Sequence, residues 1–261
     1  MVIAIIGILA SLLLPVLSAT KKKAQSAACL NNMHQLGLAF IMYSGDNGDQ
    51  IIPYVDGHGG GFYWGPSYST GESIQAAQQA VETDLSGTNN PLAPYVPNPM
   101  TFHCPGDTRY KTRLPGNGWA FGSYSKTQNI AGDPYPAMGM AYWGCGQTYA
   151  KTTLIAAPSQ TFIFCEDADS TGESRGTWVV TWILARGSFE WTDPPAQYHI
   201  NQNTYGFADG HSERHRWNNA AIISYGLQAA NGLPMPTTFP GPVSGPDFQY
   251  VHDGYRFPGW K

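Results

Sequence analysis

The sequence predicts an α+β fold in which a long N-terminal helix packs on an antiparallel, β-rich head. The first 44 residues form one continuous helical pattern, apolar at its start and amphipathic afterwards, which ends at a polar cluster beginning with Gly45. The chain holds 30 glycines and 20 prolines, 13% of its residues are aromatic and only 12% are charged, which favours strands and loops over a helical bundle. We therefore divide the 261 residues into an N-terminal helix, 1–44, and a globular head, 45–261.

Residues 1–20 carry no charged side chain and predict a membrane-spanning helix. Twenty helical residues are about 30 Å long, which is roughly the thickness of a bilayer core. The side chains expected to serve both membrane insertion and assembly are Val2, Ile3, Ile5, Ile6, Ile8, Leu9, Leu12, Leu13, Leu14, Pro15 and Leu17. Because Pro15 removes one backbone donor, we expect a flexible point there, with a tolerated membrane-helix proline as the alternative.

Three lysines, Lys21 to Lys23, follow the apolar run directly. In a cleavable secretory signal the positive charges precede the apolar segment, so a signal peptide cut near residues 18–20 is the weaker alternative. The positive-inside rule by itself would keep a head behind these lysines in the cytoplasm. Past the lysines, residues recur every three or four positions and predict one helix face that packs on the head: Ala27, Leu30, Met33 or His34, Gly37, Phe40 and Tyr43.

The head is expected to begin with a loop-rich region and a short helix at 72–84. Strands are predicted at 123–125, 141–143, 161–165 and 177–184. The last two lie on runs rich in β-branched and aromatic residues. Residues 204–217 predict a hairpin in which Asp209-Gly210 fits a two-residue type I′ turn. Residues 231–261 are rich in proline and predict an extended loop over the surface.

Four stretches of the sequence match one family closely. They are VIAIIGILASLLLPVLS at 2–18, NNMHQLGLAFIMYSGDNGD at 31–49, FHCPGD at 102–107, and a signature in which nine residues separate His199 from Asp209-Gly210, with HSE directly after. This combination resembles the large-headed type IV prepilin-like proteins, which are related to the G-like pseudopilins of type II secretion systems. The resemblance covers both ends of the chain and says little about residues 50–95 and 220–261.

The resemblance implies a pilin-like head and a structural subunit of a type IV pilus-like or type II secretion pseudopilus filament. It also implies a single-pass protein of the inner (cytoplasmic) membrane with its head exported to the periplasm or cell surface, and like subunits as partners through the N-terminal helix. The family's leader, cleavage-site glycine, N-terminal phenylalanine and nearby glutamate would lie upstream of Met1. We expect a start placed too late, in which case prepilin peptidase is a further partner and N-methylation follows; loss of the processing site is the alternative.

Other functions have weaker support in the sequence. The main rival is a membrane-anchored, exported binding module for carbohydrate or an envelope polymer that does not polymerise, and an exported hydrolase is a third interpretation. No enzyme is expected, because the chain has no G-x-S-x-G, P-loop, H-E-x-x-H or G-x-G-x-x-G motif. Nucleic acid is not an expected partner either, because the net charge is −4 and no basic run follows the three lysines.

The four cysteines, Cys29, Cys104, Cys145 and Cys165, include no C-x-x-C motif. An even number in an exported head allows two disulfides. We predict that Cys29 pairs with Cys104 and Cys145 with Cys165, although four cysteines allow three pairings and buried free thiols are the alternative.

No cofactor is expected, with one alternative. His199, Asp209 and His211 could converge with Glu166 and Asp167 on a neighbouring strand end and hold a structural zinc or calcium ion. The simpler interpretation is that Asp209-Gly210 only forms a turn and that His199 hydrogen-bonds to the hairpin.

Overall fold

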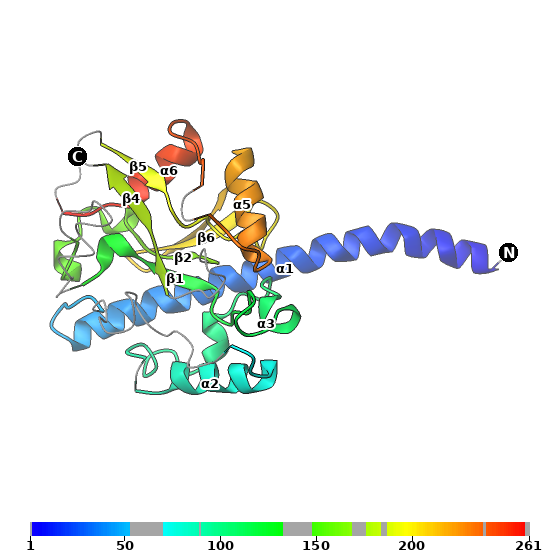
Figure 1. Ribbon diagram of the computed structural model, residues 1–261, viewed down its shortest axis with the longest axis horizontal. Coiled ribbons are helices and arrows are strands. Elements are labelled where there is room, and N and C mark those ends of the chain that lie inside the picture. Colours follow the sequence, from blue (N-terminus) through cyan, green and yellow to red (C-terminus); the bar gives the residue numbers. More distant parts are fainter. Residues whose placement is uncertain are drawn as a thin grey trace.

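The computed structural model describes residues 2–52, 70–88, 90–132, 148–168, 176–183, 187–236 and 239–258. These residues form an α+β protein with one long N-terminal helix and a mainly antiparallel sheet, which confirms the predicted fold class at this level (Figure 1). The strand predicted at 141–143 and Cys145 lie outside the described residues.

Helix α1, Val2–Asp46, is a single helix of 45 residues that contains Pro15. Its first half projects from the head and its second half crosses the body of the protein (Figure 1). It ends two residues later than predicted, where Asn47 donates its side-chain amide to the carbonyl of Tyr43 at 2.7 Å and Gly48 adopts a φ of 63°. A side-chain donor and a left-handed glycine together satisfy carbonyls that the helix leaves open.

The membrane-spanning role expected for the first half of α1 is not supported. Within the described part of the chain, no helix has a stretch that is both long and apolar enough to cross a membrane. The expected localisation as a single-pass inner-membrane protein is therefore wrong on this finding.

The sheet has five strands in the order β3-β1-β2-β6-β7, in which β1 and β3 are parallel and the other pairs are antiparallel. Their bounds are Tyr124–Thr127 for β1, Phe162–Glu166 for β2, Thr177–Trp178 for β3, Gln202–Phe207 for β6 and Ser212–Arg216 for β7. A separate hairpin pairs β4, Val180–Ile183, with β5, Ser188–Trp191. The strand predicted at 177–184 is therefore split at Val179 between two sheets.

Each face of the sheet has its own apolar core. One core joins the second half of α1 to β2 and to helix α2, Ile74–Ser86, which was predicted two residues earlier. The other core is dominated by aromatic rings and joins the sheet to the β4-β5 hairpin and to two C-terminal helices (Figure 1). The remaining helical segments are η1 Pro99–Phe102, α3 Arg109–Thr112, η2 Gln128–Ile130, η3 Thr152–Leu154, η4 Pro158–Gln160, α5 Ala220–Ala230 and α6 Pro246–Gly254.

Helix α6 corrects the prediction of an extended C-terminal loop. Pro246 occupies the first turn, where a missing N–H costs nothing. Phe248 and Val251 then point into the aromatic core, and Phe248 stacks on Phe189 with ring centroids 4.7 Å apart. Burial against the sheet therefore stabilises a short helix that the proline-rich composition of the tail did not predict.

The β6-β7 hairpin is confirmed, but its turn is not of type I′. Gly210 has a φ of 89° while Asp209 does not have a positive φ, and the backbone bonds join Gly210 N–H to Phe207 O and Phe207 N–H to His211 O. This is the three-residue connection that ends on a left-handed glycine. A Cβ at Gly210 would also lie 2.9 Å from the Ile41 side chain, so helix packing and backbone conformation both require glycine here.

Candidate functional site

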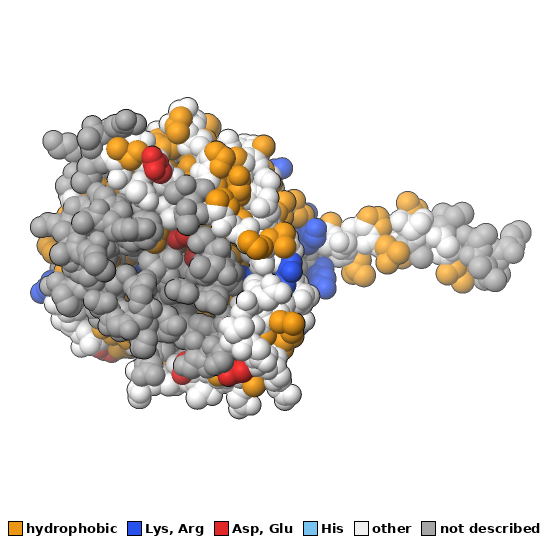
Figure 2. Space-filling model, viewed as in Figure 1, with side chains coloured by type: hydrophobic (Ala, Val, Ile, Leu, Met, Phe, Trp, Pro, Cys, Tyr) orange, Lys and Arg blue, Asp and Glu red, His pale blue; other side chains and the backbone are white. Residues whose placement is uncertain are grey.

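The first half of α1 exposes large apolar side chains over more than half of its circumference. Leu12, Leu13 and Leu14 are 64%, 65% and 66% exposed. Because consecutive helical residues point about 100° apart, these three already face three different directions. Figure 2 shows apolar side chains along the whole described part of the projecting helix. The full set is Ile6, Leu9, Leu12, Leu13, Leu14, Val16 and Leu17.

Positive charge collects where this projecting half meets the head (Figure 2). A pocket of about 250 Å³ at the junction is lined by Lys22 and Lys23 of α1 and by Arg214 and Arg216 of β7. Arg214 also donates to Ser26 Oγ at 3.1 Å, which ties β7 to the helix. The four cations suit an anionic group of a partner more than a neutral ligand.

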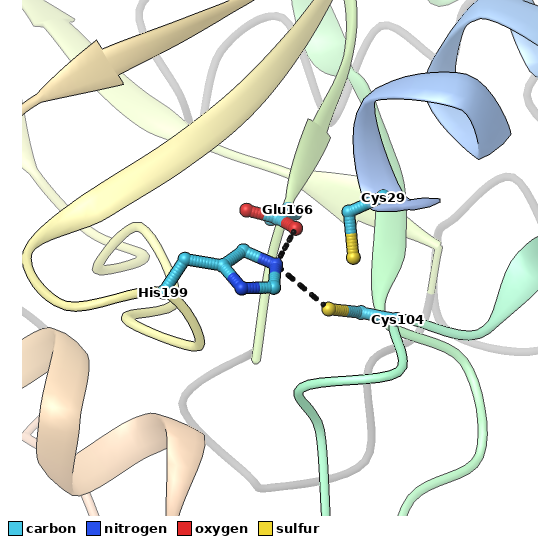
Figure 3. A group of neighbouring side chains, drawn as sticks. All are labelled: Cys29, Cys104, Glu166 and His199. Carbon is cyan, nitrogen blue, oxygen red and sulfur yellow. Dashed lines mark hydrogen bonds and ion pairs between the residues drawn. The ribbon is translucent and has the colours of Figure 1, made fainter. Parts of the chain in front are cut away.

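A second candidate site lies inside the protein. Cys29, Cys104, Glu166 and His199 are all buried, and their ligand-type atoms lie within 4.8 Å of one another. Figure 3 shows the four side chains converging on one point from α1, the loop after η1, the end of β2 and the loop before β6. His199 Nε2 lies 3.1 Å from Glu166 Oε1 and 3.1 Å from Cys104 Sγ.

The FHCPGD stretch positions this cluster residue by residue. Phe102 is fully buried in the core under α1, and His103 donates from Nδ1 to the carbonyl of Phe121 at 2.7 Å. Pro105 O accepts a 2.7 Å hydrogen bond from Gln25 of α1. A Cβ at Gly106 would lie 2.9 Å from His199 Cε1, so only glycine lets the histidine ring approach.

A buried ion pair fixes the end of the same stretch. Asp107 and Arg109 form a salt bridge at 2.8 Å, and Ser123 Oγ donates to the same carboxylate at 2.8 Å. Burial raises the pKa of the Asp107 carboxyl, but the charge and hydrogen bonds of Arg109 outweigh it and hold the pKa below its usual range. Because the two buried charges compensate each other, removing one would leave the other buried without its nearest counter-charge.

The electrostatics of the cluster favour a charged histidine. Burial lowers the pKa of His199, but the charge of Glu166 and hydrogen bonds to Cys29 and Glu166 outweigh it and raise the pKa to about 10. Burial raises the pKa of the Cys104 thiol well above its usual value. The opposite oxygen of the carboxylate, Glu166 Oε2, accepts a 2.8 Å hydrogen bond from the backbone N–H of Thr204, which fixes its orientation.

The geometry of the cluster does not match a catalytic triad, in which a nucleophile, a base and an acid that orients the base follow one another. Such a relay uses both ring nitrogens of the histidine, one for the nucleophile and one for the carboxylate. Here Cys104 and Glu166 both contact Nε2, and the buried Nδ1 has no hydrogen-bond partner among the described residues. Cys104 and Glu166 are moreover 0% exposed, so the arrangement suits the holding of an ion more than catalysis on an outside substrate.

The residues proposed from the sequence as metal ligands are only partly brought together. His199 and Glu166 meet as expected, whereas Asp209 and His211 pair with each other at the exposed hairpin turn and are not in the cluster. Asp167 accepts instead from Ser125 Oγ at 2.9 Å. The nine-residue spacing therefore does not bring His199 and Asp209 to one ion.

The structure bears on only one of the two predicted disulfides. Cys29 and Cys104 lie side by side as buried free thiols, so their predicted disulfide stays a prediction that the geometry allows. Cys165 is a buried free thiol outside the cluster, and its predicted partner Cys145 lies outside the described residues. Sequence reasoning placed Cys29 and Cys104 together but did not join them to His199 and Glu166, because no short spacing links the four positions.

Comparison with protein-family models, with curated proteins and with solved structures finds no match to this chain.

Proposed function

We propose that this protein is a structural subunit of a filament of the type IV pilus or type II secretion pseudopilus kind, in which the projecting half of α1 packs against the same helix of neighbouring copies. The observation that carries the proposal is the set of seven large apolar side chains, 55–67% exposed, that lie on this half of the helix. The resemblance of residues 2–18 and of the His199 to Gly210 signature to prepilin-like proteins supports the same assignment.

The distribution of the apolar surface decides what kind of partner it needs. A helix with one narrow apolar stripe can be covered by one flat surface, but a helix whose large apolar side chains point over more than half of its circumference needs partners on more than one side. Full burial of such a side chain contributes about 1.5–3 kcal/mol, so the seven together contribute on the order of 10 kcal/mol before the costs of association.

The partner that best covers these exposed apolar side chains is the same helix of further copies of the chain. Each copy brings an apolar surface of the same length, so a bundle of these helices encloses every member on several sides at once. The exposed Lys21 to Lys23 end the apolar stretch where the head begins, which places the heads around the bundle. In such a bundle their charges would remain in water, and the basic pocket lined by Lys22 and Arg214 lies at the same junction.

Sedimentation velocity and electron microscopy of the full chain in detergent-free buffer test the proposal. We expect filaments for the unaltered chain, and monomers for Leu13→Asp, because a carboxylate inside the bundle would be buried without a partner. Val243→Asp is the matched control, since Val243 is 77% exposed on the head, and it should assemble like the unaltered chain.

A monodisperse monomer of the unaltered chain at high concentration would contradict the proposal. So would filaments of equal length and abundance from Leu13→Asp. Circular dichroism and thermal melting of the dispersed variants show that the head has kept its fold, so that loss of assembly is attributable to the helix surface.

A further inference from the structure

We infer that Cys29, Cys104, Glu166 and His199 form a structural zinc site that fastens the second half of α1 to the head (Figure 3). This inference does not depend on filament assembly. It also differs from the ligand set suggested by the sequence, because two cysteines take the places of Asp209 and His211.

The chemistry of the four side chains selects the metal. Two cysteine sulfurs and one imidazole nitrogen are the ligands that zinc prefers in structural sites, and a carboxylate oxygen completes the set. Calcium and magnesium take oxygen ligands instead and would leave both sulfurs unused. The donor set therefore indicates zinc and not an alkaline-earth ion.

The spacing of the ligand atoms suits a tetrahedral ion. With bonds of about 2.3 Å to sulfur and about 2.0–2.2 Å to nitrogen and oxygen, the edges of the tetrahedron are about 3.3–3.8 Å. The two edges that run from His199 Nε2, to Glu166 Oε1 and to Cys104 Sγ, are both 3.1 Å, and the other separations lie within 4.8 Å. Shifts of a few tenths of an ångström to about 1 Å would bring the four atoms to these distances.

The surroundings are those of a closed, structural site. All four residues are buried, between 0% and 4% exposed, so no position remains open for a substrate. The ligands are held by their own neighbours: Thr204 N–H donates to Glu166 Oε2, and Gly106 N–H donates to Cys104 Sγ at 3.3 Å. Such outer hydrogen bonds orient metal ligands before the ion binds.

The backbone directly after His199 is strained, as expected where the chain must turn this side chain into the cluster. Ile200 and Asn201, directly after His199, have φ values of 44° and 49°. A β-branched residue in the left-handed region is an outlier that costs of order 1–3 kcal/mol. The chain accepts this cost at the point where it turns His199 into the cluster.

Binding exchanges protons for the metal without any redox change. Zinc takes thiolate, neutral imidazole and carboxylate ligands, so Cys29 and Cys104 lose their thiol protons and His199 Nε2 loses the proton that it shares with Glu166. A disulfide between Cys29 and Cys104 would use the same two sulfurs and exclude the ion. The zinc site and the predicted disulfide are therefore mutually exclusive states of one pair.

Metal analysis of the full chain, purified under reducing conditions, tests the inference. We expect one zinc per chain, and after exchange with Co²⁺ we expect the intense visible bands of tetrahedral cobalt with a thiolate-to-cobalt charge-transfer band. Adding Zn²⁺ to the metal-free chain should raise its melting temperature, and a chelator should lower it again.

Two variants and a matched control assign the metal to this site. Cys104→Ser and His199→Gln should each lose the zinc and, after exchange with Co²⁺, the thiolate charge-transfer band. Cys165→Ser should keep both, because Cys165 is equally buried but lies outside the cluster. The cobalt spectrum is recorded on the unaltered chain. It therefore tests the inference even if one of the variants fails to fold.

Three results would overturn the inference. The first is a chain with no bound zinc and no melting shift when Zn²⁺ is added under reducing conditions. The second is a cobalt spectrum without thiolate charge transfer. The third is a mass smaller by two hydrogens that places a Cys29–Cys104 disulfide in the native protein.

Discussion

The two halves of α1 differ in what covers them. In the second half Cys29, Met33, Leu36 and Phe40 are all 0% exposed and lie in the core on one face of the sheet. In the first half every described large apolar side chain is at least 55% exposed. One continuous helix therefore contains a second half that the head covers and a first half whose described apolar side chains remain exposed.

The difference teaches that the shape of an apolar surface, and not its amount, decides where a helix is buried. The second half has one apolar stripe, which a single sheet face can cover. Gly37 and Gly206 allow that approach to be close: a Cβ at Gly37 would lie 3.1 Å from Gly210 O, and one at Gly206 would lie 3.1 Å from Met33. The large apolar side chains of the first half point over more than half of the helix circumference, so one flat surface could not cover them all.

The largest expected effect comes from breaking the packed half. Phe40→Ala should lower the free energy of unfolding by about 3–5 kcal/mol, because the ring is fully buried and packs edge-on against Phe164 with centroids 6.2 Å apart. Leu13→Ala should change the stability of dispersed monomers by less than about 0.5 kcal/mol. Urea denaturation followed by tryptophan fluorescence measures both.

A control within the packed half sharpens this comparison. Leu38 is 43% exposed although it lies two residues from Phe40, so Leu38→Ala should cost much less than Phe40→Ala. Equal losses for Phe40→Ala and Leu13→Ala would show that the isolated chain buries both halves of the helix, contrary to the contrast drawn above.

The next largest expected effect is the pH dependence of stability, which should differ between a lysine of the head and a lysine at the base of the projecting half of α1. Lys22 is exposed at the base of the projecting half, whereas Lys126 on β1 is buried and donates to Ile52 O at 2.7 Å and Ala131 O at 3.1 Å. Burial lowers the pKa of Lys126 to about 7. Between pH 7 and the usual lysine pKa, the unfolded chain binds this proton and the folded chain does not, so stability should rise with pH.

Unfolding measured at several pH values checks this sign. From pH 7 to 9 the unaltered chain should gain stability relative to Lys126→Met with a slope of up to about 1.4 kcal/mol per pH unit. Below pH 7 the two should run parallel, because both states of the unaltered chain then carry the proton. Lys22→Met is the control and should keep the slope; a slope that persists in Lys126→Met would assign it to another group.

The smallest effect lies at the junction of the two halves, where Ile200 lines the basic pocket beside Lys22 and Lys23. Ile200→Gly should raise the free energy of unfolding by about 1 kcal/mol, since glycine relieves the strain of a φ of 44° and loses part of the gain through its larger unfolded-state entropy. Leu154→Gly, at an exposed residue without positive φ, should instead lower it by about 0.5–1 kcal/mol. Thermal melts of both variants compare the two signs, and a loss for Ile200→Gly would argue against strain at this position.

The elements that the sequence predicted are those specified by neighbours along the chain. The periodicity of residues 27–43 predicted the packed face of α1, and the composition of residues 204–217 predicted the β6-β7 hairpin, in which Ser212 and Arg214 bond to α1. Local spacing is sufficient there because periods of 3.6 and 2 residues define a face without knowledge of its partner. The type I′ turn at Asp209 was wrong because the approach of Ile41 and the pairing of Phe207 with His211 select another connection.

The sequence by itself determined a long helix that is apolar at its start and amphipathic afterwards, a hairpin at residues 204–217, and several of the residues suited to metal binding. Only the tertiary structure decided that Cys29, Cys104, Glu166 and His199 meet, that Asp209 and His211 stay outside, and that the proline-rich tail folds into α6. The physical reason is the distance along the chain. Local propensity acts over a few residues, whereas the cluster and α6 depend on burial between segments whose separation no pattern in the sequence encodes.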